Sequence, residues 1–407
     1  MWQREAVRSG GTRGVDAHRA GRAAARTARR RLARATAAGT LALTAVVGAG
    51  GWAAGPQQQP ITGPPPGTAA WRADTVQGRE LPDPATASPR RVAAFFASLS
   101  PDARRELAER HPGVVGNLDG APVALRYAAN ALAYARHTGR PLPGERQLLA
   151  FDPRGRGLVT EVVGDLSRAR RVAVVVPGSD LDLADHDGAR TAARNLHARL
   201  ERTAPGVPTA VVAWVGYTTP DGLGIDAATD RLAEAGAPRL TRFLTGLAAT
   251  TDAATPALFC HSYGSLLCAR ADADRADTHR TDAGRTDADR TDADRADAGD
   301  VVFLGSPGTG LSHAADVPGA RRVWATELAE ADWVAHVPHV RLLGLGHGAD
   351  PTDPAFGARV VSAAGAEGHD GYFAPGTASL AAYAAITLGR YDAVPRADGD
   401  AGGSGPG

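Results

Sequence analysis

The chain has 407 residues, of which 43% are hydrophobic, and its 45 basic residues are balanced by 44 acidic ones. A chain of this length and composition can bury a full core. With almost no net charge it lacks an overall field that would attract a polyanion, so we expect no nucleic-acid partner.

The N-terminal region is expected to export the protein. Residues 1–34 contain ten arginines against two acidic residues, and residues 35–55 contain no charged residue. This order is typical of an export signal, and residues 35–55 are also long enough to anchor the chain in a membrane or cell envelope. We therefore predict an extracellular domain, or one anchored and facing outward. A tail before a cytosolic enzyme is the alternative.

A Pro-rich stretch follows, and we predict that residues 56–87 form a linker that extends rather than packs. The folded domain is expected over residues 88–396, with a flexible tail at 397–407. Its first part, residues 88–138, has the pattern of helices.

Helix starts can be placed within this first part. Ser88-Pro89 and Ser100-Pro101 each put a capping hydroxyl before a proline at the first helical position. A third helix is expected from about Pro122.

After residue 138 the pattern becomes strand-like. QLLAFD and GLVTEVVGD flank Arg154-Gly155-Arg156, which predicts a hairpin. Continuous apolar runs then alternate with helical stretches, and this predicts a doubly wound, mostly parallel α/β sheet. The runs are RRVAVVVPGSD, TAVVAWVG, PALFCHS, DVVFLGSPG, RRVWAT and VRLLGLGH.

Between residues 270 and 300 the alternation is interrupted by a repeat of period five, in which Arg and Asp recur. Such a period scatters charges around a helix axis and leaves no apolar face. We predict a solvated, low-complexity insertion. Calcium binding by its aspartates is disfavoured because the interposed arginines would neutralise the site.

The segment ALFCHSYGSL, residues 257–266, places Ser262 between a strand and a helix, where a nucleophile elbow would present it. Cys260 stands where the GxSxG pattern expects its first glycine, and it is a small apolar replacement. Cys260 and Cys268 are eight residues apart across strand, turn and helix. We expect this separation to exceed the reach of a disulfide, and both residues to be buried thiols.

The order of residues after Ser262 matches a triad of serine, acid and histidine. Asp332 follows the strand RRVWAT and is the predicted acid. Glu327, Asp350 and Asp353 remain alternatives, because each follows one of the last two predicted strands.

His369 is the predicted base, because it lies in a loop before a terminal helix expected from about Thr377. His261 is expected to pack beside the nucleophile, and His347 to have a structural role. His186 among loop aspartates is weak evidence for metal binding. We expect no metal and no cofactor.

An oxyanion hole needs two backbone N–H groups close to the nucleophile. Ser179, just after Pro177-Gly178, is predicted to supply one, and Tyr263 the other. Ser262 would then attack a carbonyl and form an acyl-enzyme that water resolves.

Several motifs together resemble an uncharacterised actinobacterial branch of the α/β-hydrolase superfamily. They are VVPGSDLDL, CHSYGS, VVFLGSPGTGL, VWATELAEADWV, GLGHGADPTDPAFGA and GHDGYF. The resemblance covers roughly Ser88 to Tyr391 apart from the insertion. It implies the α/β-hydrolase fold with Ser262, Asp332 and His369 as the triad, and it implies no substrate.

The sequence thus predicts a serine esterase that acts on a small-molecule or lipid-like acyl ester. An acyltransferase with the same triad is one alternative, and a non-catalytic cell-envelope binding protein is another. Retention of a serine, a histidine and nearby carboxylates favours the enzyme.

Overall fold

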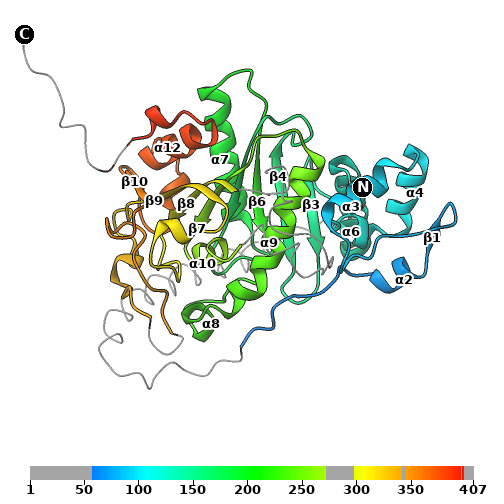
Figure 1. Ribbon diagram of the computed structural model, residues 1–407, viewed down its shortest axis with the longest axis horizontal. Coiled ribbons are helices and arrows are strands. Elements are labelled where there is room, and N and C mark those ends of the chain that lie inside the picture. The colour runs from blue at the N-terminus through cyan, green and yellow to red at the C-terminus, as the bar shows by residue number, and fades with distance from the viewer. Residues whose placement is uncertain (1–56, 272–297, 342–344, 396, 398–407) are drawn as a thin grey trace, which may run out of the picture. The chain divides into compact units, whose positions relative to one another are not determined.

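The computed structural model describes residues 57–271, 298–341, 345–395 and 397 (Figure 1). The predicted regions at 1–34 and 35–55, most of the repeat at 270–300, and nearly all of the tail at 397–407 therefore lie outside the described residues. Among the helices that are described, none combines the length and apolarity needed to cross a membrane.

An eight-stranded sheet forms the centre of the domain, in the order β10-β9-β8-β7-β5-β6-β4-β3. Strands β5 to β10 run parallel to one another. Strands β3 and β4 form an antiparallel hairpin, and β4 pairs with β6. This confirms the predicted mostly parallel sheet and its hairpin. The strands are β3 (Gln147–Asp152), β4 (Leu158–Gly164), β5 (Arg171–Val176), β6 (Thr209–Val215), β7 (Ala257–His261), β8 (Ala298–Leu304), β9 (Ala320–Thr326) and β10 (Arg359–Val361).

Helices cover both faces of this sheet, with α7 (Asp187–Thr203) and α12 (Ala378–Thr387) on one face and α9 (Arg231–Thr250) and α10 (Gly264–Cys268) on the other (Figure 1). Successive residues of β5, such as Val174 and Val175, enter two different apolar clusters. Because successive side chains of a strand point to opposite faces, central strands buried on both faces are apolar throughout.

Most of the remaining described helices lie in the N-terminal part of the domain, and they differ in length. They are α2 (Thr68–Arg72), α3 (Pro89–Ala97), α4 (Pro101–Arg110), α5 (Pro112–Val115), α6 (Val123–Thr138) and α8 (Ile225–Ala228). The 3-10 helices are η3 (Ala314–Asp316), η4 (Trp333–His336), η5 (Gly371–Phe373) and η6 (Tyr391–Ala393).

The predicted helix starts are confirmed. The Ser88 hydroxyl accepts a hydrogen bond from the N–H of Arg91 at 3.3 Å, and the Ser100 hydroxyl accepts one from Ala103 at 3.2 Å. Each cap satisfies a backbone donor that the first helical turn leaves without a partner. The third helix begins directly after Pro122.

The predicted linker at 56–87 is wrong for its described part, because residues 57–87 pack on the domain. They contain α2 and a small hairpin of β1 (Thr75–Val76) and β2 (Arg79–Glu80). Trp71 is fully buried, and its indole N–H donates to the Pro82 carbonyl at 2.8 Å. Proline content predicts an extended backbone but does not say whether neighbouring side chains find a surface to bind.

Gln58 shows how this segment is attached. Its backbone N–H donates to Asp226 Oδ2 at 2.7 Å, and its carbonyl accepts from Arg231 Nη2 at 2.6 Å. Its side-chain amide donates to the Thr219 carbonyl at 3.1 Å and accepts from the Asp221 N–H at 2.9 Å. The segment is thereby bound to the loop that follows β6.

Of the strand predicted at VRLLGLGH, residues 340–347, the described residues 340–341 and 345–347 belong to no strand of the sheet, so the prediction is wrong for them. Among the described residues the last strand is β10, which pairs in parallel with β9. Gly346 and Gly348 have φ values of +80° and +82°, which extended strands do not adopt. The apolar run therefore misled the prediction, and its glycines were the contrary signal.

Replacing Gln58 with alanine should lower the free energy of unfolding by about 1–2 kcal/mol, because two hydrogen bonds of its side chain are lost. Gln59, which is exposed, is the matched control, and Gln59→Ala should change the free energy by less than about 0.5 kcal/mol. Urea unfolding of both variants measures the difference. Equal stabilities would mean that residues 57–61 are not held as described.

Candidate active site

Ser262 lies on a sharp turn between β7 and α10. Its φ is +54°, a left-handed conformation that a residue with a side chain adopts only under constraint. The N–H of Ser262 donates to the Leu304 carbonyl at 2.9 Å. A Cβ atom on Gly264 would lie 2.7 Å from the Pro177 carbonyl oxygen, so only glycine fits there. The predicted elbow geometry is therefore present.

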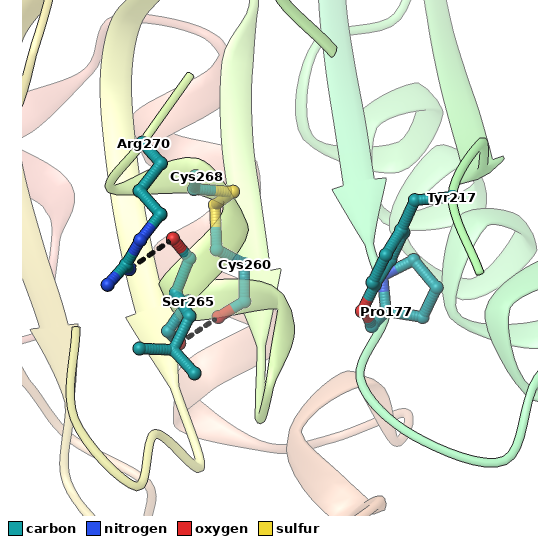
Figure 2. Close-up of a disulfide and its surroundings, with 7 residues drawn as sticks. Pro177, Tyr217, Cys260, Ser265, Cys268 and Arg270 are labelled. Atoms are coloured by element: carbon teal, nitrogen blue, oxygen red, sulfur yellow. Dashed lines mark hydrogen bonds between the residues drawn. A yellow bond between two sulfur atoms is a disulfide. The ribbon is translucent and has the colours of Figure 1, made fainter. Parts of the chain in front are cut away.

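Cys260 and Cys268 form a disulfide, so the prediction of two buried thiols is wrong (Figure 2). The turn at Ser262 brings α10, which ends at Cys268, back alongside the end of β7, and the two Cα atoms are 6.3 Å apart. That distance lies within the range a disulfide spans. The Ser265 hydroxyl also donates to the Cys260 carbonyl at 3.0 Å. Both contacts join the segments on either side of Ser262.

His369 and Asp332 form a hydrogen-bonded pair. His369 Nδ1 lies 2.9 Å from Asp332 Oδ1, and the Asp332 side chain is fully buried. The Tyr372 hydroxyl donates to Asp332 Oδ2 at 2.5 Å, and the N–H of Val334 donates to Oδ1 at 2.9 Å. The carboxylate therefore has a donor on each oxygen.

The alternative carboxylates have other partners. Glu327 accepts from the N–H of Ala363 at 3.3 Å. Asp350 and Asp353 accept from N–H groups two residues further along their own loop. Asp332 is thus the carboxylate that the fold brings to His369.

The pKa of Asp332 lies below its ordinary value. Burial alone would raise this pKa, because it disfavours the charged form, but the hydrogen bonds from His369, Tyr372 and the Val334 N–H lower it more. The carboxylate is therefore ionised at neutral pH, as an orienting acid must be.

The His369 imidazole lies beside the residues that flank Ser262. A Cβ atom on Gly305, the residue after Leu304, would come within 3.1 Å of His369 Cε1. His261 Nε2 donates to the His369 carbonyl at 2.8 Å, and the centroids of the two rings are 4.6 Å apart. Burial lowers the pKa of His261 to about 4, so this ring is neutral, and it packs beside Ser262 as predicted.

The residues predicted to form the oxyanion hole also lie at the turn. A Cβ atom on Gly178 would lie 2.5 Å from the Cβ atom of Ser262, so the loop after β5 approaches Ser262 directly. Ser179 follows Gly178, and Tyr263 follows Ser262. Within the described part of the chain, neither the Ser179 N–H nor the Tyr263 N–H donates to a protein acceptor.

His347 and His186 have structural partners. His347 Nε2 donates to the Ala227 carbonyl at 2.7 Å, and His186 lies 3.6 Å from the buried Glu161 carboxylate. No cluster of three or more metal-ligating side chains occurs among the residues that are described.

Sequence reasoning missed Tyr372, which binds the acid. Its signal was its position in the motif GHDGYF, three residues after His369, where a short helical turn returns the side chain toward the acid. The role of Gly305 was also missed, because a requirement for empty space has no signature in one sequence.

The chain is similar in sequence to a known family of proteins. The sequence model of an alpha/beta hydrolase family matches residues 152–342. This range includes most of the sheet, Ser262 and Asp332. Over this range the chain resembles the alpha/beta hydrolase family, and its sheet and covering helices form the α/β-hydrolase fold.

Its relatives include two uncharacterized mycobacterial proteins. One, from Mycobacterium tuberculosis, is 26% identical over 398 residues, which cover 77% of this chain and 58% of that protein. Another, from Mycobacterium bovis, is 34% identical over 187 residues, which cover 43% of this chain and 62% of that protein. The chain thus spans less than two thirds of the length of these relatives.

Solved structures to which it is similar include two hydrolases. A Xanthomonas campestris α/β serine hydrolase without a lid has a TM-score of 0.33 and 14% identity, with 61% of this chain and 96% of that chain covered. Carboxyl esterase 2 from Tuber melanosporum has a TM-score of 0.34 and 12% identity, with 65% and 98% covered.

Protein purified under oxidising conditions and then denatured should take up no iodoacetamide, because both cysteines are in the disulfide. After reduction, two alkyl groups per chain should appear in the intact mass. Alkylation of both cysteines without prior reduction would mean that Cys260 and Cys268 are free thiols, as the sequence had predicted.

Proposed function

We propose that this α/β hydrolase is a serine esterase that works through an acyl-enzyme. The observation that carries the proposal is the 2.9 Å hydrogen bond between His369 and the buried Asp332, next to a serine held in a left-handed turn. A structural serine would not need this conformation, and a structural histidine would not need a fully buried carboxylate beside it.

Each side chain has one role in the proposed reaction. Ser262 Oγ attacks the ester carbonyl carbon, and His369 Nε2 takes the hydroxyl proton and then gives it to the leaving alcohol. Asp332 keeps the proton of His369 on Nδ1 and stabilises the imidazolium that forms. A water molecule activated by the same histidine then hydrolyses the acyl-enzyme.

Charge develops on the carbonyl oxygen of the substrate during both steps. The backbone N–H groups of Ser179 and Tyr263 are the proposed donors to this oxygen. Among the residues that the structure describes, neither N–H has a protein acceptor, and this supports the role, because a donor already paired could not bind the oxyanion.

The substrate class we propose is a small-molecule or lipid-like acyl ester, and the site of action is outside the cytoplasm. The arginine-rich and apolar N-terminal regions motivate the proposed export. The disulfide supports it as well, because disulfides persist mainly in oxidising compartments.

Labelling with a fluorophosphonate probe tests the nucleophile. The wild-type protein should be labelled at Ser262 and should hydrolyse nitrophenyl esters of short acyl chains. Ser262→Ala should lose both properties and keep its thermal unfolding midpoint. Equal labelling of this variant would exclude Ser262 as the nucleophile.

The same assay separates the proposed esterase from the other two classes of protein. An acyltransferase would be labelled but would transfer the acyl group to an added alcohol faster than to water. A binding protein without catalysis would be neither labelled nor active.

Asp332→Asn should lower kcat by up to about 10⁴-fold, the loss seen when the acid of a serine-protease triad is replaced by its amide, because the imidazole is then held in the wrong tautomer. The matched controls are Glu327→Gln, Asp350→Asn and Asp353→Asn, which should each retain most of the activity. Steady-state kinetics with a nitrophenyl ester measures all four. A larger loss in any control than in Asp332→Asn would move the acid to that residue.

A further inference from the structure

The loop after β5 is hydrogen-bonded along its length to the loop after β6. The Asp180 N–H donates to the Pro220 carbonyl at 2.8 Å, and the Gly222 N–H donates back to Asp180 Oδ1 at 2.7 Å. The Thr219 hydroxyl donates to the Leu181 carbonyl at 2.5 Å. The second loop therefore supports the one that approaches the nucleophile.

Tyr217 supports the same loop at Pro177 and at Gly178, which lies against Ser262. Its hydroxyl donates to the Pro177 carbonyl at 2.8 Å, and the Gly178 carbonyl oxygen is 3.4 Å away. In Figure 2 the Tyr217 hydroxyl lies beside Pro177, which directly follows β5. The ring is 1% exposed, and burial raises its pKa well above 10, so the hydroxyl is a neutral donor.

The position of the Tyr217 ring is itself determined by packing. The ring stacks between Trp214 and Tyr263, with centroid distances of 6.2 Å and 6.5 Å and interplanar angles of 14° and 9°. A Cβ atom on Gly236 of α9 would come within 2.7 Å of the Tyr217 Cβ, so the helix approaches this residue as closely as glycine allows. The hydroxyl consequently has little freedom to leave the loop.

The direction of the Ser179 N–H depends on the Gly178 carbonyl. Both belong to one planar trans peptide unit, in which C=O and N–H point in opposite directions. A group that holds the Pro177 and Gly178 carbonyls on one side of the loop therefore turns the Ser179 N–H toward the other side. Gly178 itself lies against Ser262.

We propose that Tyr217 is a positioning residue of the oxyanion hole, which acts by holding the Pro177 and Gly178 carbonyls so that the Ser179 N–H faces the reacting carbonyl. The inference rests on the proposed function. Tyr217 touches neither the substrate nor the reacting atoms, and it transfers no proton. Its ring also packs against Tyr263, whose N–H is the other proposed donor, so both donors depend on one aromatic stack.

Tyr217→Phe removes the hydroxyl and keeps the stacked ring. Because a single oxyanion donor is worth about 10²–10³ in kcat, its misalignment should lower kcat by about 10–100-fold. KM for a nitrophenyl ester should change by less than about threefold, since the ground-state carbonyl makes weaker use of the donors. Inhibition by a trifluoromethyl ketone, which forms a tetrahedral adduct, should weaken in parallel with kcat.

Tyr383→Phe is the matched control. It removes a hydroxyl from another fully buried tyrosine. Tyr383 belongs to α12, and its hydroxyl is hydrogen-bonded to Thr326 at 2.9 Å. It should lose stability to a similar extent and keep the wild-type kcat. An equal fall of kcat in both variants would mean that Tyr217 acts only through stability.

Thr219→Val decides the case if Tyr217→Phe fails to fold, because it breaks the hydrogen bond to Leu181 on the same loop while keeping the side-chain shape. It should lower kcat with little change in KM. An unchanged kcat in a folded Tyr217→Phe, or in Thr219→Val if only that variant folds, overturns the inference. The proposed function is tested separately: if the wild type is active and Ser262→Ala is not, Ser262 is the nucleophile whatever Tyr217 does. A wild type that is inactive and unlabelled overturns both proposals.

Discussion

The left-handed backbone at Ser262 is the constraint on which the site depends. An L-residue adopts this conformation at a cost of about 1–2 kcal/mol, so surrounding contacts must maintain it. The N–H of Ser262 is bound by Leu304, glycine at position 264 allows the next helix to begin against the neighbouring strand, and a disulfide joins the strand before the turn to the helix after it.

Around this turn the fold brings together groups from distant parts of the chain. Asp332 and His369 come from loops that follow β9 and β10, and Tyr372 binds the carboxylate oxygen that the histidine leaves free. On the other side, the loops after β5 and β6 are hydrogen-bonded to each other, and Gln58 from the N-terminal segment binds the loop after β6. These groups near Ser262 thus have a second layer of hydrogen bonds behind them.

The sheet, the hairpin, the helix starts and the residues at the turn were predictable, because apolar runs, capping serines and the CHSYGS segment are local signals. The elbow disulfide was not, because its cysteines meet only through the reversal of direction at Ser262. Packing of residues 57–87 was missed for a related reason: partners of Gln58 lie more than 150 residues away in the chain. Choosing Asp332 over Asp350 likewise needed the position of the last strand, which an apolar run at 340–347 had obscured.

Mass spectrometry of a trapped intermediate tests the central claim most directly. Wild-type protein mixed with a nitrophenyl ester and quenched in acid within milliseconds should carry one acyl group, and peptide mapping should place it on Ser262. The adduct should accumulate most with esters whose leaving group departs fast, because hydrolysis of the acyl-enzyme then limits turnover. An acyl group on another residue, or steady turnover of these esters with no acylated protein at any time, would contradict the account.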